Sequence, residues 1–488
     1  MEDLKERVFR GGLARLCGQG INFILRLGYT ATMARLLHPE DFGVVAMVVA
    51  VTGVYDLFTT AGLSLATVQR KAITDEQIST LFWINLLVGM LLCVTCVATA
   101  PLLVAFYHEP RLFWVTVAMG AGFLFNAAGV QHSALLQRQL RYVDLTIIEV
   151  SSLFIGFAFG ISLAISGSGY WALVGAAIAV PAVSSCLMWF FTAWVPQFPR
   201  RGVGIRAMLS FGGTITINNL IVYFAYNLDK LLVGRFWGAT SLGVYGTAYQ
   251  LANVPTNSLI GAVGGVAFSA LSRLQDDAVR LKNYFLKGAT LLVSITAPIT
   301  IFSAVFANEI VLVILGPKWV DAALIFRLLT PTILVFSIIN PTGWLLQSTG
   351  LQVRSLRIAM VIAPLVITAY VIGLPYGPKG VALGFSMAMV LWVVPHVLWC
   401  LHDTQISPRE FFSAISRPFF AAIAAVILPL VFTLLWLDQL LSPFFELLIA
   451  GCMMVSLYLS LLLFVFGGGN FYWGILRGLK SSLRTRSL

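Results

Sequence analysis

The chain has 488 residues, of which 59% are hydrophobic and only 10% are charged, and its formal net charge is +11. Soluble domains carry about 25% charged residues, so this composition excludes a water-soluble globular protein. The apolar runs are about 20 residues or longer, which suits membrane-spanning helices rather than the shorter strands of a β-barrel. The sequence therefore predicts an all-α polytopic membrane protein.

The predicted elements are fourteen apolar spans joined by mostly short loops. In chain order they are Gly12–Leu37, Phe42–Val68, Ile78–Phe106, Leu112–Leu136, Val143–Ile165, Tyr170–Val195, Ile205–Val233, Ser241–Phe268, Phe285–Leu315, Ala322–Gln347, Leu356–Tyr376, Gly380–Leu401, Ile415–Leu437 and Pro443–Phe466. Lys and Arg concentrate in every second connection, beginning with the N-terminal segment, and this bias places both termini in the cytoplasm. Because the basic residues have this role, the net charge does not indicate a nucleic-acid partner.

The first span carries a narrow polar stripe formed by Arg15, Gln19, Asn22 and Arg26. These positions follow the spacing i, i+4, i+7, i+11, which places them on one side of a helix. A polar stripe along an apolar helix predicts one wall of an aqueous path.

A similar stretch appears 200 residues later. Gly243 follows Arg235 by eight residues, as Gly43 follows Arg35. The seventh span has polar or aromatic side chains at the positions that match the first span: Asn219, Tyr223, Tyr226 and Lys230. Since six spans separate the copies, both run in the same direction, which predicts two parallel six-helix halves with the substrate path between them. The predicted parts are residues 1–204, residues 205–401 and two additional helices with a basic tail in 402–488.

The sequence has no signature of an enzyme. It lacks a P-loop, an HExxH motif and a GxSxG motif, and its loops are too short for a nucleotide-binding domain. Cys93 and Cys96 have CxxC spacing, but they lie within an apolar span and are expected to be packing residues. We therefore expect a transporter without a metal or an organic cofactor.

Basic side chains inside the spans mark the candidate substrate path. A charge near the bilayer centre costs about 3 kcal/mol or more, so it should face water or a partner. Arg26 either lines a cationic cavity or pairs with Asp56, and the two roles are compatible. For Lys230 the alternative is an ion pair with a neighbouring helix or snorkelling to the outer surface, and for Arg327 it is a similar structural role. The other expected cavity residues, for which interhelical packing is the alternative, are Gln19, Asn22, Asn219, Tyr223 and Tyr226.

Three acidic residues inside or near the ends of spans are candidates for coupling or gating: Asp56, Glu149 and Asp229. For Glu149 we favour a cytoplasmic latch to a loop arginine such as Arg138 or Arg141. For Asp229 we favour a structural pair or a helix cap. If one of the three couples transport to a gradient, the ion is H⁺ or Na⁺.

Two stretches resemble a known family. One is Ala34–Met47 (ARLLHPEDFGVVAM), followed by Gly62-Leu63 and Gln69–Lys71, and the other is Asn227–Tyr245 (NLDKLLVGRFWGATSLGVY). They are similar to bacterial polysaccharide exporters of the Wzx type, nearest to the colanic-acid-exporter branch. This group belongs to the multidrug/oligosaccharidyl-lipid/polysaccharide superfamily.

The resemblance implies a MATE-like fold in the bacterial inner membrane and the flipping of undecaprenyl-diphosphate-linked oligosaccharide units to the periplasmic leaflet. It also implies coupling to an ion gradient, contact with membrane lipid, and a polysaccharide polymerase and chain-length regulator as partners. Arg26 and Lys230 fit the cationic cavity residues of the lipid-flipping members. The alternatives are a cation-coupled drug or metabolite antiporter, which should have acids in its cavity, and a lipid II flippase.

Overall fold

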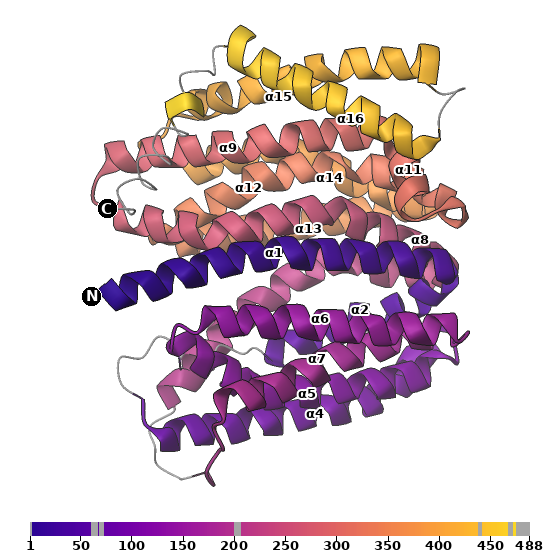
Figure 1. Ribbon diagram of the computed structural model, residues 1–488, viewed down its shortest axis with the longest axis vertical. Coiled ribbons are helices and arrows are strands. Elements are labelled where there is room, and N and C mark those ends of the chain that lie inside the picture. The colour runs from indigo at the N-terminus through magenta and orange to yellow at the C-terminus, as the bar shows by residue number, and fades with distance from the viewer. Residues whose placement is uncertain are drawn as a thin grey trace. The chain divides into compact units, whose positions relative to one another are not determined.

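The computed structural model describes residues 2–59, 67, 73–199, 206–437, 442–466 and 472–474. Helices make up nearly all of this part of the chain, and it contains no β-strand (Figure 1). Nine of the described helices are long and apolar enough to cross a membrane, or ten if the bent pair Pro317–Leu329 and Pro331–Ser348 is one span. The prediction of an all-α polytopic membrane protein is confirmed, and the count of fourteen spans stays a prediction.

The chain forms two compact units. Unit 1 comprises Met1–Thr247 and Val361–Val381, and unit 2 comprises Ala248–Met360 and Ala382–Leu488. Three helices contribute to both units: α8 (Arg206–Arg273), α13 (Gln352–Gly373) and α14 (Gly377–Leu401). The division predicted from the repeat, with boundaries after residues 204 and 401, stays a prediction.

The other helices of unit 1 are α1 (Glu2–Leu36), α2 (Pro39–Thr59), α4 (Asp75–Tyr107), α5 (Leu112–Arg138), α6 (Tyr142–Ile165) and α7 (Trp171–Thr192). The main packing pairs are α4 with α5, α6 with α7, α5 with α7, and α1 with α6. Met33 of α1 and Leu37, which follows the helix, are buried against Ala164 and Ala172, and this cluster fixes the end of α1 that leads into α2.

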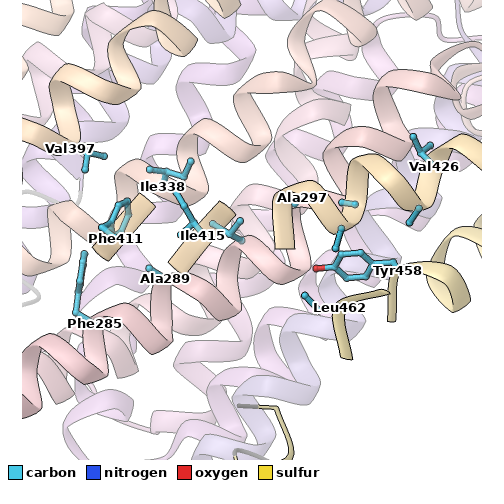
Figure 2. Close-up of a cluster of buried hydrophobic side chains, with 14 of the residues drawn as sticks. Phe285, Ala289, Ala297, Ile338, Val397, Phe411, Ile415, Val426, Tyr458 and Leu462 are labelled. Carbon is cyan, nitrogen blue, oxygen red and sulfur yellow. The ribbon is translucent and has the colours of Figure 1, made fainter. Parts of the chain in front are cut away.

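The other helices of unit 2 are α9 (Ala278–Val305), α10 (Ala307–Ile314), α11 (Val320–Leu329), α12 (Pro331–Ser348), α15 (Pro408–Phe432) and α16 (Pro443–Ser460). α9 packs against α12, α15 and α16. Figure 2 shows part of the resulting apolar core, in which Phe285, Ile415 and Tyr458 are buried. The Tyr458 hydroxyl donates to the carbonyl oxygen of Ser294 at 2.8 Å, so a polar group in this core is satisfied.

Local sequence signals explain several helix ends. α4 begins with a capping box, in which the Gln77 amide donates to Thr74 Oγ1 at 3.3 Å and the Thr74 amide donates to Gln77 Oε1 at 3.2 Å. α15 begins with a second capping box, formed by Ser407 and Glu410. Each box satisfies backbone N–H groups that the first turn leaves without a partner, and so fixes where the helix begins.

Glycine accounts for the break in α8. Gly238 has φ 78° and ψ −179°, a conformation that side-chain-bearing residues rarely adopt, and it separates residues 206–237 from 239–273. The break lies between the predicted end of the seventh span, Val233, and the predicted start of the eighth, Ser241. The two predicted spans therefore correspond to the two parts of α8.

The predicted span Ala322–Gln347 is interrupted. α11 ends at Leu329, α12 begins at Pro331, and the helix pair is bent by 41°. Proline has no backbone N–H and is favoured at the first position of a helix, so Pro331 starts a new helix rather than lying inside one.

Candidate functional site

α1 lies tightly against α6 in unit 1. A Cβ atom on Gly18 would lie 2.3 Å from Thr146 Cγ2, so a larger residue would push the helices apart. About three turns further along α1, the ring of Tyr29 stacks on Phe157 with a centroid distance of 4.1 Å. These contacts fix which side of α1 faces its neighbour.

The first residue of the polar stripe forms an ion pair across this contact. Arg15 Nη1 lies 2.7 Å from Glu149 Oε1 and 2.9 Å from Oε2. Glu149 therefore latches to α1 and not to the loop arginines that the sequence suggested, because Arg141 pairs with Asp144 at 2.6 Å and Arg138 donates to a backbone carbonyl. The latch was predicted correctly in kind, but its partner was not.

The Arg15–Glu149 pair should contribute modestly to stability. The two side chains are 32% and 36% exposed, so we expect Arg15→Gln and Glu149→Gln each to lower the free energy of unfolding by about 0.5–1 kcal/mol. The double variant should lose no more than the worse single variant, since either change removes the same pair. Urea unfolding followed by intrinsic fluorescence measures this, and Arg280→Gln, in the more exposed pair with Asp277, is the matched control. Fully additive losses would contradict the latch.

Arg26 and Gln19 have exposed side chains on α1. The neighbouring Ile24 is 68% exposed and Ile21 is 45% exposed. At 100° per residue, Ile24 points about 160° away from Arg26 around the helix. The exposed face of α1 is thus apolar on one side, which suits lipid, and polar on the other, which suits water or an anion.

Two further polar atoms on α1 are buried without a hydrogen bond to any residue that the structure describes. They are Asn22 Oδ1 and the Tyr29 hydroxyl, which lie seven residues apart and so on one side of the helix. A buried polar atom without a partner is costly. Water or a hydroxyl-bearing ligand beside α1 would satisfy both.

Asp56 is an exposed residue of α2. Within the described part of the chain, no ion pair joins it to Arg26. Arg26 and Asp56 thus both lie in unit 1, but the structure does not show the Arg26–Asp56 pair, which was one of the two alternatives for Arg26.

Tyr223 links α8 to α2. Its hydroxyl donates to the carbonyl oxygen of Ala50 at 3.0 Å and lies 2.2 Å from the place where a Cβ of Gly53 would be. This glycine is therefore needed for the approach of the tyrosine. Tyr223 has an interhelical contact here, which is the alternative to a sugar-binding role that the sequence left open.

Lys230, one of the expected cavity cations, is half-buried on α8. Its Nζ donates to Asn227 Oδ1 at 2.7 Å, and the side-chain Nδ2 of Asn227 donates to the carbonyl oxygen of Tyr223 at 3.0 Å. This chain of hydrogen bonds holds the ammonium group close to its own helix. A ligand could engage Lys230 only with these bonds in place or by exchanging them.

Asp229 is fully buried, with 0% of its surface exposed. The Tyr245 hydroxyl donates to its Oδ2 at 2.7 Å, while its Oδ1 has no hydrogen-bond partner among the described residues. Asp229 is thus a hydrogen-bonded core residue and not a helix cap. A carboxyl group with one satisfied and one vacant oxygen can hold a proton, because the vacant oxygen can carry it.

The remaining predicted cavity residues are placed as follows. Tyr226 is half-buried on α8. Arg327 is an exposed residue of α11 in unit 2. Asn219 lies in α8, at a position whose side chain is outside the described part of the structure.

The two repeated turns contact each other. A Cβ on Gly43 would lie 1.7 Å from the carbonyl oxygen of Ala239, and a Cβ on Gly243 would lie 1.8 Å from the carbonyl oxygen of Pro39. The same position on Gly243 is 3.0 Å from the Gly43 amide nitrogen. Each copy therefore places its glycine against the backbone of the other, an arrangement expected of two segments related by rotation.

Sequence reasoning missed three contacts of this site. The repeated spacing of Arg35–Gly43 and Arg235–Gly243 identified the two glycines. It did not predict that they lie against each other. The partner of Glu149 lies 134 residues away on α1, and Tyr245 is 16 residues from Asp229 across the break in α8. A pairing of Tyr245 with Asp229 was open to prediction, because both stand in the quoted stretch Asn227–Tyr245.

Residues 32–324 match the model of a protein family described as "Polysaccharide biosynthesis protein". The chain belongs to this family. The matched region includes both turns and Asp229, and it begins after Arg26. The predicted resemblance to polysaccharide exporters is confirmed.

Individual proteins agree with the family assignment. The chain is 26% identical over 432 residues to the lipopolysaccharide biosynthesis protein WzxC of Escherichia coli (strain K12), covering 87% of each chain. It is 30% identical over 285 residues to the amylovoran biosynthesis protein AmsL of Erwinia amylovora, covering 57% of this chain and 71% of that protein. In fold it is similar to the lipid II flippase MurJ in an inward closed conformation, with a TM-score of 0.74 at 13% identity over 96% of this chain and 100% of MurJ.

Proposed function

We propose that this protein moves undecaprenyl-diphosphate-linked oligosaccharide units across the bacterial inner membrane by alternating access. The observation that carries the proposal is the placement of Arg26. It is an exposed cation on α1, opposite the apolar exposed face that Ile24 marks, in a chain of the polysaccharide biosynthesis family. The planar guanidinium group of an arginine can donate two parallel hydrogen bonds to two oxygens of a diphosphate.

The rest of the architecture follows the same proposal. Fourteen spanning helices would form two parallel six-helix halves, with two additional helices and both termini in the cytoplasm. The diphosphate would bind Arg26, with Lys230 and Arg327 as further cations. The sugar hydroxyls would meet polar groups such as Asn22 and Gln19, while the lipid tail stays in the bilayer. A polymerase and a chain-length regulator would receive the flipped unit.

The lipid-linked unit should accumulate on one side of the membrane when the protein is removed. Deletion of the gene should abolish surface polysaccharide and leave the lipid-linked repeat units inaccessible to a sugar oxidant added to spheroplasts. The wild-type protein supplied from a plasmid should restore both. Normal export in the deletion strain would contradict the proposal, and a block in peptidoglycan synthesis with its lipid-linked precursor retained on the cytoplasmic side would instead favour a lipid II flippase.

Asp229 is the residue we propose for coupling to a proton gradient. We expect Asp229→Asn to keep the hydrogen bond from Tyr245, and so the fold, but to reduce export about tenfold or more because the amide cannot exchange a proton. Tyr245→Phe is the matched control, because it removes the hydroxyl and leaves the carboxyl group able to titrate. Export by Asp229→Asn at the wild-type level, with equal protein abundance, would exclude Asp229 as the coupling group.

A further inference from the structure

Unit 2 has a basic cavity that lies apart from the residues discussed so far. Its volume is about 550 Å³. It is lined by Arg354 and Arg357 from the start of α13, by Pro395, Leu398 and Trp399 from the end of α14, and by His402 and Asp403, which follow α14. The three α14 residues follow i, i+3, i+4 spacing and the arginines follow i, i+3, so one side of each helix faces the cavity.

One of the two arginines holds the cavity wall together. The side chain of Arg354 is 18% exposed, donates to the carbonyl oxygen of His402 and lies 3.5 Å from Asp403 Oδ2. The same carboxylate oxygen is 2.7 Å from His402 Nδ1. Arg354 therefore fastens α13 to the connection after α14, and Asp403 balances its charge.

The second arginine is available to a ligand. Arg357 is exposed, and it has no carboxylate partner among the residues that the structure describes. Because Asp403 is already paired with Arg354, the cavity retains the positive charge of Arg357. A cavity of this charge attracts an anion.

An apolar strip continues from the cavity along α14. Leu391 is 70% exposed, and Val394 and Leu398 are each 48% exposed. They follow i, i+3, i+7 spacing, so they form one surface that leads from Arg357 towards the middle of the helix. The cavity thus has a cationic end next to an exposed apolar track, and its lining includes Trp399, a residue type enriched at membrane interfaces.

We propose that this cavity binds an anionic phospholipid, with the phosphate on Arg357 and an acyl chain along Leu398, Val394 and Leu391. The predicted orientation puts this end of α14 in the cytoplasmic leaflet, whose anionic lipids attract basic groups near the surface. The substrate's diphosphate has the same chemistry, but the cavity lies at a helix end, beside an acyl-chain track, and we commit to the phospholipid. The proposal goes beyond the flipping of sugars and does not depend on it.

Binding can be measured on the purified full-length protein by native mass spectrometry in detergent. We expect phosphatidylglycerol to bind more tightly than phosphatidylcholine. Arg357→Gln should weaken the binding of phosphatidylglycerol about five- to tenfold, since one arginine–phosphate contact is lost. Arg409→Gln is the matched control, because Arg409 is also an exposed cation of unit 2 but does not line the cavity. It should bind as the wild type does.

A second variant keeps the test decisive if Arg357→Gln folds poorly. Leu398→Glu places a negative charge beside the cavity at an already exposed position, and it should also weaken the binding of phosphatidylglycerol. Wild-type affinity in both variants, or equal binding of the two lipids, would overturn the proposal. Displacement of phosphatidylglycerol by undecaprenyl diphosphate would do so as well, because the cavity would then be a substrate site.

Discussion

Replacement of Arg26 by alanine should lower export about 30- to 1000-fold. The reason is that a charge-assisted contact between Arg26 and the diphosphate, which becomes buried when the substrate binds, is worth about 2–4 kcal/mol. Arg26 is exposed on the polar side of α1 and has no ion pair with Asp56 in the part of the chain that the structure describes. The change should therefore affect the substrate more than the fold. Surface polysaccharide per cell, normalised to protein abundance, measures the effect.

Two further variants separate charge from geometry. Arg26→Lys should restore part of the export if charge alone matters, and little of it if the diphosphate needs a forked contact. Ile24→Ala is the matched control, because Ile24 is exposed on the opposite, apolar side of the same helix and should leave export nearly unchanged. Retained export in Arg26→Ala at normal abundance would remove Arg26 from the substrate path.

The role of Asp56 can be tested in the same assay. We expect the losses caused by Arg26→Lys and Asp56→Asn to multiply in the double variant, since no ion pair joins the two residues within the described structure. Partly active variants are needed, because two complete losses cannot be compared. A double variant no worse than the worse single variant would instead show that the two residues act as a pair.

The parts of the fold that could be predicted are those with local causes. Apolar length predicted where most of the helices lie, because a span must satisfy its own backbone in lipid. The gap between the predicted spans Ile205–Val233 and Ser241–Phe268 contains the break in α8, which lies at Gly238 because φ 78° suits glycine. A proline inside the predicted span Ala322–Gln347 favours a kink, and the bend of 41° lies at Pro331, whose missing N–H ends one helix and starts another.

The site was predictable in its residue types and less so in its pairings. Charges inside spans identified Arg26, Asp229 and Glu149 because each is costly there. Their partners come from other helices, as Glu149 with Arg15 shows, and spacing along the chain carries no information about such a contact. The sequence showed the polar stripe but not the surroundings of each side chain. In the structure Arg15 is paired, Gln19 and Arg26 are exposed, and Asn22 has a buried Oδ1.

Alanine at Gly43 or Gly243 should destabilise the contact between the repeated turns. The added Cβ would lie 1.7 or 1.8 Å from a carbonyl oxygen of the other turn, so the turns must move apart. Overpacking of this kind costs about 1–3 kcal/mol or more, and we expect a lower unfolding temperature and a loss of export in each variant. Gly246→Ala is the matched control, because its Cβ would meet nothing within 4 Å. It should be neutral or slightly stabilising, since alanine favours a helix.

The double variant distinguishes a shared contact from two separate ones. The two glycines face the same crossing, and the separation that admits one methyl group also makes room for the other. The loss in Gly43→Ala/Gly243→Ala should therefore be smaller than the sum of the single losses. If the losses add fully, each glycine is needed only for its own turn. If they do not, the repeated Arg–Gly spacing is explained: both copies keep a glycine because each copy must admit the backbone of the other.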